Sequence, residues 1–208
     1  MARGLFITFE GTDGSGKTTQ IKMLTEYLEK SGRQVINTIE PGGTGLGKKI
    51  RHILLSPENT GMSSRAETLL FQASRAELVS KVIKPALQSG KIVICDRFFD
   101  STIAYQGIAR GLGVEDMLDM SLWATGGLEP DLTFLLSIDF RKGKKRLSGE
   151  SPDRIEMEED SFQQKICQGY RELAARFPDR IAEVDAGLSI EEVFDAIRKK
   201  VERELGNI

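Results

Sequence analysis

The sequence is poor in cysteine and histidine, with two and one in 208 residues. Cys95 and Cys167 lie far apart and match no metal-ligand spacing, which excludes a cysteine-based metal site and predicts core thiols in a reducing compartment. His52 lies in a polar stretch, so we expect a solvated surface residue there instead of a catalyst. Catalysis must therefore depend on other side chains.

An excess of charge of either sign and long apolar runs are also missing. The chain has 29 basic and 31 acidic residues, for a net charge of −2. Proteins that bind nucleic acids usually carry a basic excess, so no nucleic-acid partner is expected. No run is long enough to span a membrane and no signal-peptide region is evident, so we expect no membrane partner and a cytoplasmic protein.

Apolar, β-branched runs alternate with helical patterns along the whole chain. The predicted strands cover residues 5–9, 34–39, 92–95, 132–138 and 181–184. Short continuous apolar runs are typical of strands buried on both faces. The alternation therefore predicts one α/β domain over residues 1–208, a parallel sheet covered by helices on both faces.

The segments between these strands contain helix start and stop signals. Ser64 and Glu67 form a capping-box pattern, which predicts a helix that starts after Ser64 and is kinked or broken at Pro85. Ser189 and Glu192 form a second such pattern before the last helix. Apolar residues at helical spacing predict a further helix over 162–177.

Residues 11–18 match the phosphate-binding pattern GxxxxGK(S/T). They are Gly11, Thr12, Asp13, Gly14, Ser15, Gly16, Lys17 and Thr18. A β-prone apolar segment precedes them and an amphipathic helical pattern follows, which is the context that a nucleotide-binding loop requires. The alternative is a simple glycine-rich turn between a strand and a helix, and this context argues against it.

The residue types in this loop suit an anionic ligand and its metal ion. Glycines let the backbone turn tightly and point N–H groups inward, and the N-terminus of the following helix favours negative charge. Lys17 can reach the β- and γ-phosphates of a nucleotide, and the Thr18 hydroxyl is placed to ligate Mg²⁺.

Asp96 and Arg97 directly follow the third predicted strand. Ligands of doubly wound sheets bind at the carboxyl ends of the strands, so both side chains should face the phosphate loop. Asp96 could hold Mg²⁺ directly or through water, and Arg97 could grip a second phosphate, as in a kinase with two phosphate sites. A surface ion pair at a strand end is the alternative.

Other arginines recur near the predicted loops, at positions 51, 75 and 154. Guanidinium groups bind phosphate through two parallel hydrogen bonds, so Arg51, Arg75 and Arg154 suit a phosphorylated acceptor, although each one alone is more often a solvated residue. Phe71 and Arg75 lie one helical turn apart on one face and could stack on a base and bind a phosphate. Read alone, Phe71 would be a core residue.

A basic run, Lys142, Lys144, Lys145 and Arg146, flanks an irregular stretch over residues 143–160 that is rich in charge, Ser and Gly. This composition predicts a mobile basic lid around 142–160, which would close over ATP and exclude water. A solvated charge run is the alternative for the lysines.

Five segments together are more specific than the phosphate loop alone. They are residues 10–19 (EGTDGSGKTT), 40–44 (EPGGT), 70–75 (LFQASR), 96–98 (DRF) and 104–107 (AYQG). In this order and at similar spacing the chain resembles bacterial thymidylate kinases from the first strand to the last helix. The resemblance implies the P-loop kinase fold with strand order 2-3-1-4-5, a homodimer packed through helices, and the reaction of ATP and dTMP with Mg²⁺ to give ADP and dTDP.

The resemblance also implies roles at the end of the site that binds the acceptor base. Phe71 would stack on thymine, and Arg75 would donate a hydrogen bond to a base carbonyl. Gln106 would contact the base edge, with Thr102 nearby, where many relatives carry Ser.

Other roles implied by the resemblance concern phosphates, sugar and adenine. Arg51 and Arg97 would bind the dTMP phosphate, and Asp13 would approach the sugar 3′-hydroxyl. Thr19 would complete the donor loop, Arg146 would lie against adenine, and residues 185–186 would border it.

The family stabilises the transferred charge with a basic residue either in the phosphate loop or in the lid. No base occupies positions 12–15, so this chain resembles the lid-arginine type, and Arg154 is the best candidate beside Lys17 and Arg97. Two positions depart from the family pattern: Ile39 replaces an Arg before EPGGT, and Lys48 replaces a common acidic residue. These changes affect fine details of acceptor binding.

Two rival functions remain open from the sequence. A kinase acting on dUMP, dCMP or a nucleoside would differ around Phe71, Arg75, Thr102 and Gln106. A P-loop regulatory module would show a guanine-binding NKxD motif or a strand ending in Asp-Glu, and this chain has neither.

Overall fold

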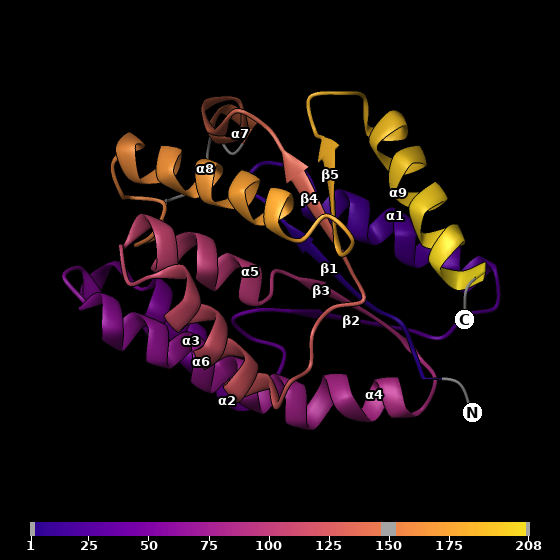
Figure 1. Ribbon diagram of the computed structural model, residues 1–208, viewed down its shortest axis with the longest axis horizontal. Helices are drawn as coiled ribbons and strands as arrows, with labels where there is room; N and C mark the ends of the chain where they lie inside the picture. The colour runs from indigo at the N-terminus through magenta and orange to yellow at the C-terminus, as the bar shows by residue number, and fades with distance from the viewer. Residues whose placement is uncertain (1–2, 147–152, 207–208) are drawn as a thin grey trace.

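The computed structural model describes residues 3–146 and 153–206, which form a parallel sheet with helices on both faces (Figure 1). The strands are β1 (Phe6–Glu10), β2 (Val35–Ile39), β3 (Ile92–Asp96), β4 (Leu132–Ser137) and β5 (Ile181–Asp185). Their order in the 5-stranded sheet is β2-β3-β1-β4-β5. Both the strands predicted from the apolar runs and the strand order implied by the resemblance are confirmed, with ends that differ by one residue.

The helical segments connect and cover these strands. They are α1 (Lys17–Lys30), α2 (Gly45–Leu55), the 3₁₀ turn η1 (Pro57–Asn59), α3 (Ser64–Leu78), the π-helical η2 (Val79–Ile83), α4 (Lys84–Gln88), α5 (Phe99–Thr102), the π-helical η3 (Ile103–Ala109), α6 (Val114–Thr125), α7 (Phe140–Arg146), α8 (Asp160–Arg176) and α9 (Ile190–Gly206).

The sheet separates two apolar cores because successive side chains of a strand point to opposite faces. Ile7 and Phe9 pack with α1 and α9, which lie together on one side of the sheet in Figure 1. Phe6 packs on the other side, in the cluster that includes residues of α3, α6 and α8. The three predicted layers are therefore confirmed.

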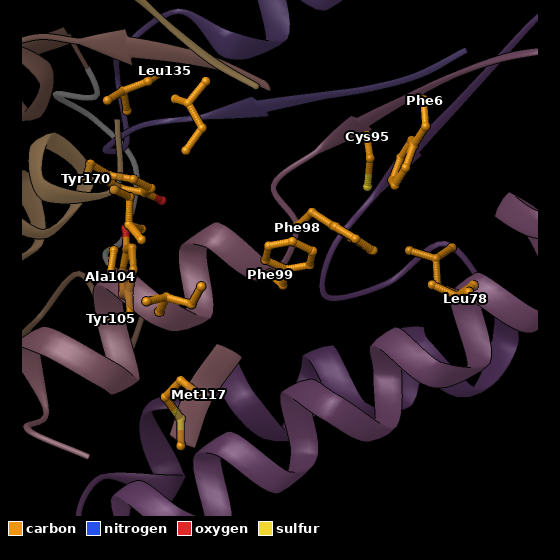
Figure 2. Packing of buried hydrophobic residues seen from close by; sticks show 14 of the residues in the cluster. Phe6, Leu78, Cys95, Phe98, Phe99, Ala104, Tyr105, Met117, Leu135 and Tyr170 are labelled. Atoms are coloured by element: carbon orange, nitrogen blue, oxygen red, sulfur yellow. The ribbon is translucent and has the colours of Figure 1, made fainter. Parts of the chain in front are cut away.

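The second cluster fixes the segment that follows β3. Phe98 and Phe99 extend from it into the core, where Phe98 lies near Phe6 of the sheet and Leu78 of α3, and Phe99 lies beside Phe98 (Figure 2). The rings of Phe6 and Phe98 lie edge to face with centroids 5.0 Å apart. This anchoring holds the adjacent Arg97 at the carboxyl end of the sheet.

Helix signals were correct in kind, with one correction at the start of α3. The N-cap of α3 is Ser63, whose hydroxyl accepts from the Ala66 amide at 3.3 Å, so the capping box predicted at Ser64 and Glu67 is wrong. Glu67 instead turns inward and is 1% exposed. The box at Ser189 and Glu192 is confirmed by reciprocal hydrogen bonds of 3.0 and 3.3 Å.

The break predicted at Pro85 takes the form of a π-helical turn. Proline lacks an amide hydrogen and its ring excludes the carbonyl four residues earlier, so the chain widens through Val79–Ile83 before α4 begins at Lys84.

The predicted lid is described in part. Residues 143–146 belong to the helix α7, which corrects the irregular structure predicted for them. Lysine and arginine have high helix propensity, and the basic residues at its last turn complement the helix dipole. Residues 147–152 lie outside the described part of the chain.

Candidate active site

A cavity of about 730 Å³ opens over the carboxyl ends of the strands. The predicted site residues that line it are Asp13, Gly14, Ser15, Gly16, Lys17, Thr18, Thr19, Arg51, Phe71, Arg75, Asp96, Arg97, Thr102, Gln106 and Arg146. Gly11 and Thr12, the first two residues of the loop, and Arg154 do not line the cavity. One cavity therefore holds both the predicted donor residues and the predicted acceptor residues.

The phosphate loop has the backbone that its glycines permit. Gly11, Gly14 and Gly16 have φ values of +133°, +73° and +94°, in the region that side-chain-bearing residues rarely adopt. Two buried hydroxyl oxygens, Oγ1 of Thr12 and Oγ of Ser15, have no hydrogen-bond partner among the described residues. Buried polar groups are normally paired, so this loop fits an anionic ligand that would supply acceptors.

Lys17 is held against the loop and is only 7% exposed. Its Nζ donates to the carbonyl oxygens of Gly11 at 3.1 Å and Thr12 at 3.2 Å. Burial, together with the positive charge of Arg97, lowers the pKa of Lys17 to about 8, against the opposing effect of Asp13. A phosphate group would offset this loss of solvation and favour the charged ammonium.

Arg97 joins the loop to the rest of the site. Its φ of +66° is rare for a residue with a side chain and costs about 1–3 kcal/mol. The guanidinium donates to the Gly11 carbonyl at 2.8 Å, to the Asp13 carboxylate at 2.7 Å and to the Tyr170 hydroxyl at 3.2 Å. The strained backbone therefore places a cation directly beside the donor loop.

Asp13 stays ionised in this setting. Burial alone would raise the pKa of its carboxyl, but the positive charges of Arg97 and Lys17 outweigh that effect and lower the pKa below its usual value. The carboxylate is thus available as a hydrogen-bond acceptor at the cavity wall.

Glu10 supports this arrangement from below, a role that the sequence analysis missed. Its carboxylate accepts from the Phe98 amide at 2.7 Å, from the Ser101 hydroxyl at 2.6 Å and from the Tyr170 hydroxyl at 3.0 Å. Burial, helped by the negative charge of Asp100, raises the pKa of Glu10 to about 7. A glutamate at the end of a buried strand was the available signal.

Arg75 forms the floor of the acceptor end and is 1% exposed. Its Nε donates to Glu40 at 3.0 Å, and its Nη atoms donate to Gln72 and Thr102 at 2.8 Å each. With further contacts to Ser121 at 3.3 Å and the Phe98 carbonyl at 3.5 Å, its donors are already engaged. Arg75 thus lines the cavity, but its donors contact protein partners, so none is left free for the predicted hydrogen bond to a base carbonyl.

Other residues complete the acceptor end. Arg51 donates to the Pro41 carbonyl at 3.0 Å and lines the cavity, as does Ile39, which is 37% exposed. Tyr105 lines the cavity as well, with its ring centroid 5.6 Å from the Arg97 guanidinium carbon. The sequence signal for Tyr105 was its place in the AYQG segment, in which a role had been assigned to Gln106 but not to Tyr105.

The donor end is closed on one side by α7. Nη1 of Arg146 donates to the Gly14 carbonyl and Nη2 to the Ala186 carbonyl, each at 3.3 Å. Gly143 lies so close to Asp13 and Gly14 that a Cβ at position 143 would overlap the Asp13 carbonyl. Arg146 therefore lies at the donor end beside Ala186.

The donor set fits a hard divalent cation such as Mg²⁺. The Thr18 hydroxyl and the Asp96 carboxylate line the same cavity. The described residues contain no group of three or more His, Cys, Asp or Glu side chains suited to a metal. Mg²⁺ typically keeps several waters and takes few protein ligands beside nucleotide phosphates, so this sparse set suits it.

Arg154 does not reach the phosphate end, in contrast to its predicted position. It is 5% exposed, and its Nε donates to the Leu54 carbonyl at 2.8 Å. Its Nη2 donates to the buried Glu67 carboxylate at 2.6 Å. A role at the transferred phosphoryl group would require both interactions to break.

Two anion-binding ends that share one cavity at the tip of a parallel sheet define the chain as a P-loop kinase. A family model described as thymidylate kinase matches residues 9–197. The chain belongs to the thymidylate kinase family.

Individual relatives agree with this assignment. The chain is 48% identical over 201 residues to a thymidylate kinase of Symbiobacterium thermophilum, covering 97% of this chain and 94% of that protein. It is 49% identical over 203 residues to a thymidylate kinase of Halothermothrix orenii, with coverages of 96% and 97%. A crystal structure of thymidylate kinase from Ehrlichia chaffeensis, 35% identical, matches with a TM-score of 0.78 over 96% of this chain and 99% of that one.

Among the described residues, no helix combines the length and the apolar character needed to cross a membrane.

Proposed function

We infer that this protein transfers the γ-phosphoryl group of ATP to dTMP and releases ADP and dTDP. The observation that carries this function is the position of Arg97, between the phosphate loop and the acceptor end of one cavity. A second candidate, phosphorylation of another deoxynucleoside monophosphate, would use the same geometry and a different base contact.

ATP would bind with its phosphates in the loop of residues 11–19. The unpartnered hydroxyl of Ser15, the Lys17 ammonium and the N-terminus of α1 all favour an anion there. Thr18 and Asp96 would hold Mg²⁺, which supplies charge neutralisation at the phosphates. Arg146, which already contacts Ala186, would lie along the adenine.

The acceptor would bind at the opposite end of the cavity. Phe71 offers an aromatic face to the base, and Gln106 offers its amide to the base edge. Arg51 and Arg97 would bind the phosphate, and Asp13 would accept a hydrogen bond from the sugar 3′-hydroxyl. Arg75 and Thr102 hold the floor of this end through their mutual hydrogen bond of 2.8 Å.

The reaction needs alignment and charge stabilisation more than acid–base chemistry. The acceptor phosphate is already anionic, so its oxygen can attack the γ-phosphorus in line without a strong general base or a covalent intermediate. Lys17 and Arg97 flank the transfer path and stabilise the developing charge.

Measurement of ADP release with ATP, Mg²⁺ and each natural deoxynucleoside monophosphate in turn tests this function. We expect turnover with dTMP far above that with the other acceptors. A preference for a different monophosphate would support the second candidate. Slow ATP hydrolysis that no acceptor stimulates would contradict both and favour a nucleotide-binding regulatory module.

We also propose that the protein is a homodimer through α2, α3 and α6, which lie side by side (Figure 1). Each helix exposes a large apolar side chain: Ile53 is 42% exposed, Leu69 60% and Trp123 83%. Monomers rarely expose such side chains together, and a second copy of the same face would cover them.

A further inference from the structure

Glu67 is a buried carboxylate at the centre of a cluster formed with Gln106, Arg110 and Arg154. Its Oε1 accepts from Nε2 of Gln106 at 2.9 Å. Its Oε2 accepts from Arg154 at 2.6 Å and from Arg110 at 3.2 Å. Glu67 lies one helical turn before Phe71 on α3, and Gln106 lines the acceptor end of the cavity. We call these four residues the Glu67 cluster.

The carboxylate dictates the orientation of the Gln106 amide. An ionised carboxylate accepts hydrogen bonds but donates none, so the NH₂ group of Gln106 must face Glu67. None of the hydrogen bonds among the described residues ends on Oε1 of Gln106. Gln106 therefore has its carbonyl oxygen free to accept a hydrogen bond from a ligand in the cavity.

Two guanidiniums keep Glu67 in its acceptor-only form. Burial alone would raise the pKa of this carboxyl, but the hydrogen bond from Gln106, the positive charge of Arg110 and the hydrogen bonds from Arg154 and Arg110 outweigh it and lower the pKa. Arg110 has a second partner, Glu158, at 2.6 Å. The positive charges of Arg110 and Arg154 thus balance the negative charges of Glu67 and Glu158.

Arg154 ties the same cluster to α2 and to the segment that precedes α8. Besides its side-chain bond to the Leu54 carbonyl, its backbone amide donates to the Leu55 carbonyl at 3.1 Å. If Arg154 moved to the phosphates, the buried Glu67 carboxylate would lose one of its two cationic partners. Because Arg154 stays bound to Glu67, it can act on the acceptor end through that carboxylate.

We propose that Glu67 is a positioning residue for base selection: it turns the carbonyl oxygen of Gln106 toward the base, so that the site selects a pyrimidine whose ring N3 carries a hydrogen. Thymine and uracil donate a hydrogen bond at N3, whereas cytosine accepts one there. Arg154 holds Glu67 in place and is a positioning residue as well. This inference rests on the proposed function, and it assigns the rejection of dCMP to a carboxylate behind the pocket wall.

The variant Glu67→Gln tests the proposal because its side chain has the same shape but an amide in place of the carboxylate. The amide of Gln106 can then face residue 67 with either its NH₂ group or its carbonyl oxygen. We therefore expect the preference for dTMP, measured as the Kd for dCMP divided by the Kd for dTMP, to fall at least about tenfold. The kcat at saturating dTMP and the affinity for ATP should change much less. The matched control is Glu158→Gln, which removes the outer partner of Arg110 and should leave the ratio unchanged.

A variant of the glutamine itself keeps the proposal falsifiable if Glu67→Gln fails to fold. Gln106→Leu should lower the same ratio, and adding Glu67→Gln to it should lower the ratio no further. A folded Glu67→Gln protein with the parent's ratio, or Gln106→Leu with the parent's ratio, would overturn the proposal. If the parent does not phosphorylate dTMP, the proposed function fails instead.

Arg154→Lys separates the two roles for that arginine. A positioning role predicts a weaker preference for dTMP over dCMP, in the same ratio of dissociation constants, with kcat nearly retained. A large fall in kcat with the ratio intact would assign Arg154 to the transferred phosphoryl group and overturn its positioning role.

Discussion

The charged side chains of the site are held by partners that are distant in the sequence. Their burial and these partners together shift their pKa values. Lys17, Arg97 and Asp13 form one charged group over the phosphate loop, with Arg97 to Asp13 at 2.7 Å. Glu10 supports Arg97 indirectly, through the Tyr170 hydroxyl that both contact.

Phe71→Ala should weaken dTMP binding by about tenfold to hundredfold, because stacking on an aromatic ring contributes roughly 1–3 kcal/mol per base. ATP affinity should stay nearly constant, since Phe71 lies at the acceptor end. Calorimetric titration of the variant with dTMP and with a non-hydrolysable ATP analogue measures both. A loss confined to the ATP analogue would show that the acceptor pocket has been assigned to the wrong end.

Glu10 should make stability pH-dependent in a direction unusual for a carboxylate. Its pKa is raised from 4.5 to about 7, so between these values the folded protein keeps a proton that the unfolded chain releases. The stabilisation is complete below pH 4.5 and is lost as the pH rises to about 7, by at most ~3 kcal/mol.

Denaturant unfolding of the parent and Glu10→Gln across this pH window measures the effect. The free energy of unfolding of the parent should fall relative to that of the variant as the pH rises. Glu26→Gln, on the exposed face of α1, controls for the general loss of a carboxylate. A parent-to-variant difference that is constant with pH would contradict the assignment.

At the scale of elements, the site depends on how α7 docks against the phosphate loop. Gly143 and Gly14 approach each other without side chains between them, and Arg146 spans from Gly14 to Ala186. This close contact brings the basic helix to the donor end. The lack of a side chain at Gly143 permits this close approach, because a Cβ there would overlap the Asp13 carbonyl.

Gly143→Ala should push α7 away from the loop and raise the KM for ATP by about tenfold, because overpacking a tight contact costs roughly 1–3 kcal/mol. The KM for dTMP should change less. Gly206→Ala is the matched control, since a Cβ at that position meets nothing within 4 Å. Equal effects of the two substitutions on the KM for ATP would argue against a specific contact at Gly143.

At the scale of the whole molecule, the neighbouring helices α2, α3 and α6 each expose a large apolar side chain: Ile53, Leu69 and Trp123. Trp123, the most exposed of the three, is 83% accessible. A charge at this position in a self-complementary interface would be buried twice, once in each subunit.

Trp123→Glu should therefore convert a dimer into a monomer, as measured by sedimentation or light scattering at micromolar concentration. Leu188→Glu, on the loop between β5 and α9, adds the same charge at a side chain that is 49% exposed and should leave the dimer intact. A monomeric parent, or a Trp123→Glu protein that remains dimeric, would contradict the proposed interface.

The sequence by itself determined the features that depend on neighbouring residues. The loop of residues 11–18 is recognisable because a strand, a glycine turn and a helix must follow one another to bind phosphate. The strands and their three-layer arrangement follow from apolar runs, and the start of α9 follows from the local capping box at Ser189 and Glu192. Asp96 and Arg97 could be placed because the carboxyl ends of parallel strands meet at one edge.

Tertiary structure alone decided which charged groups meet. Glu10 and Tyr170 are 160 residues apart, and Glu67 and Arg154 are 87 apart. Glu67 looked like a capping residue and Arg154 like a lid arginine because local patterns favour those roles. Burial overrides local preference, since a carboxylate removed from water must find its cations wherever the fold brings them.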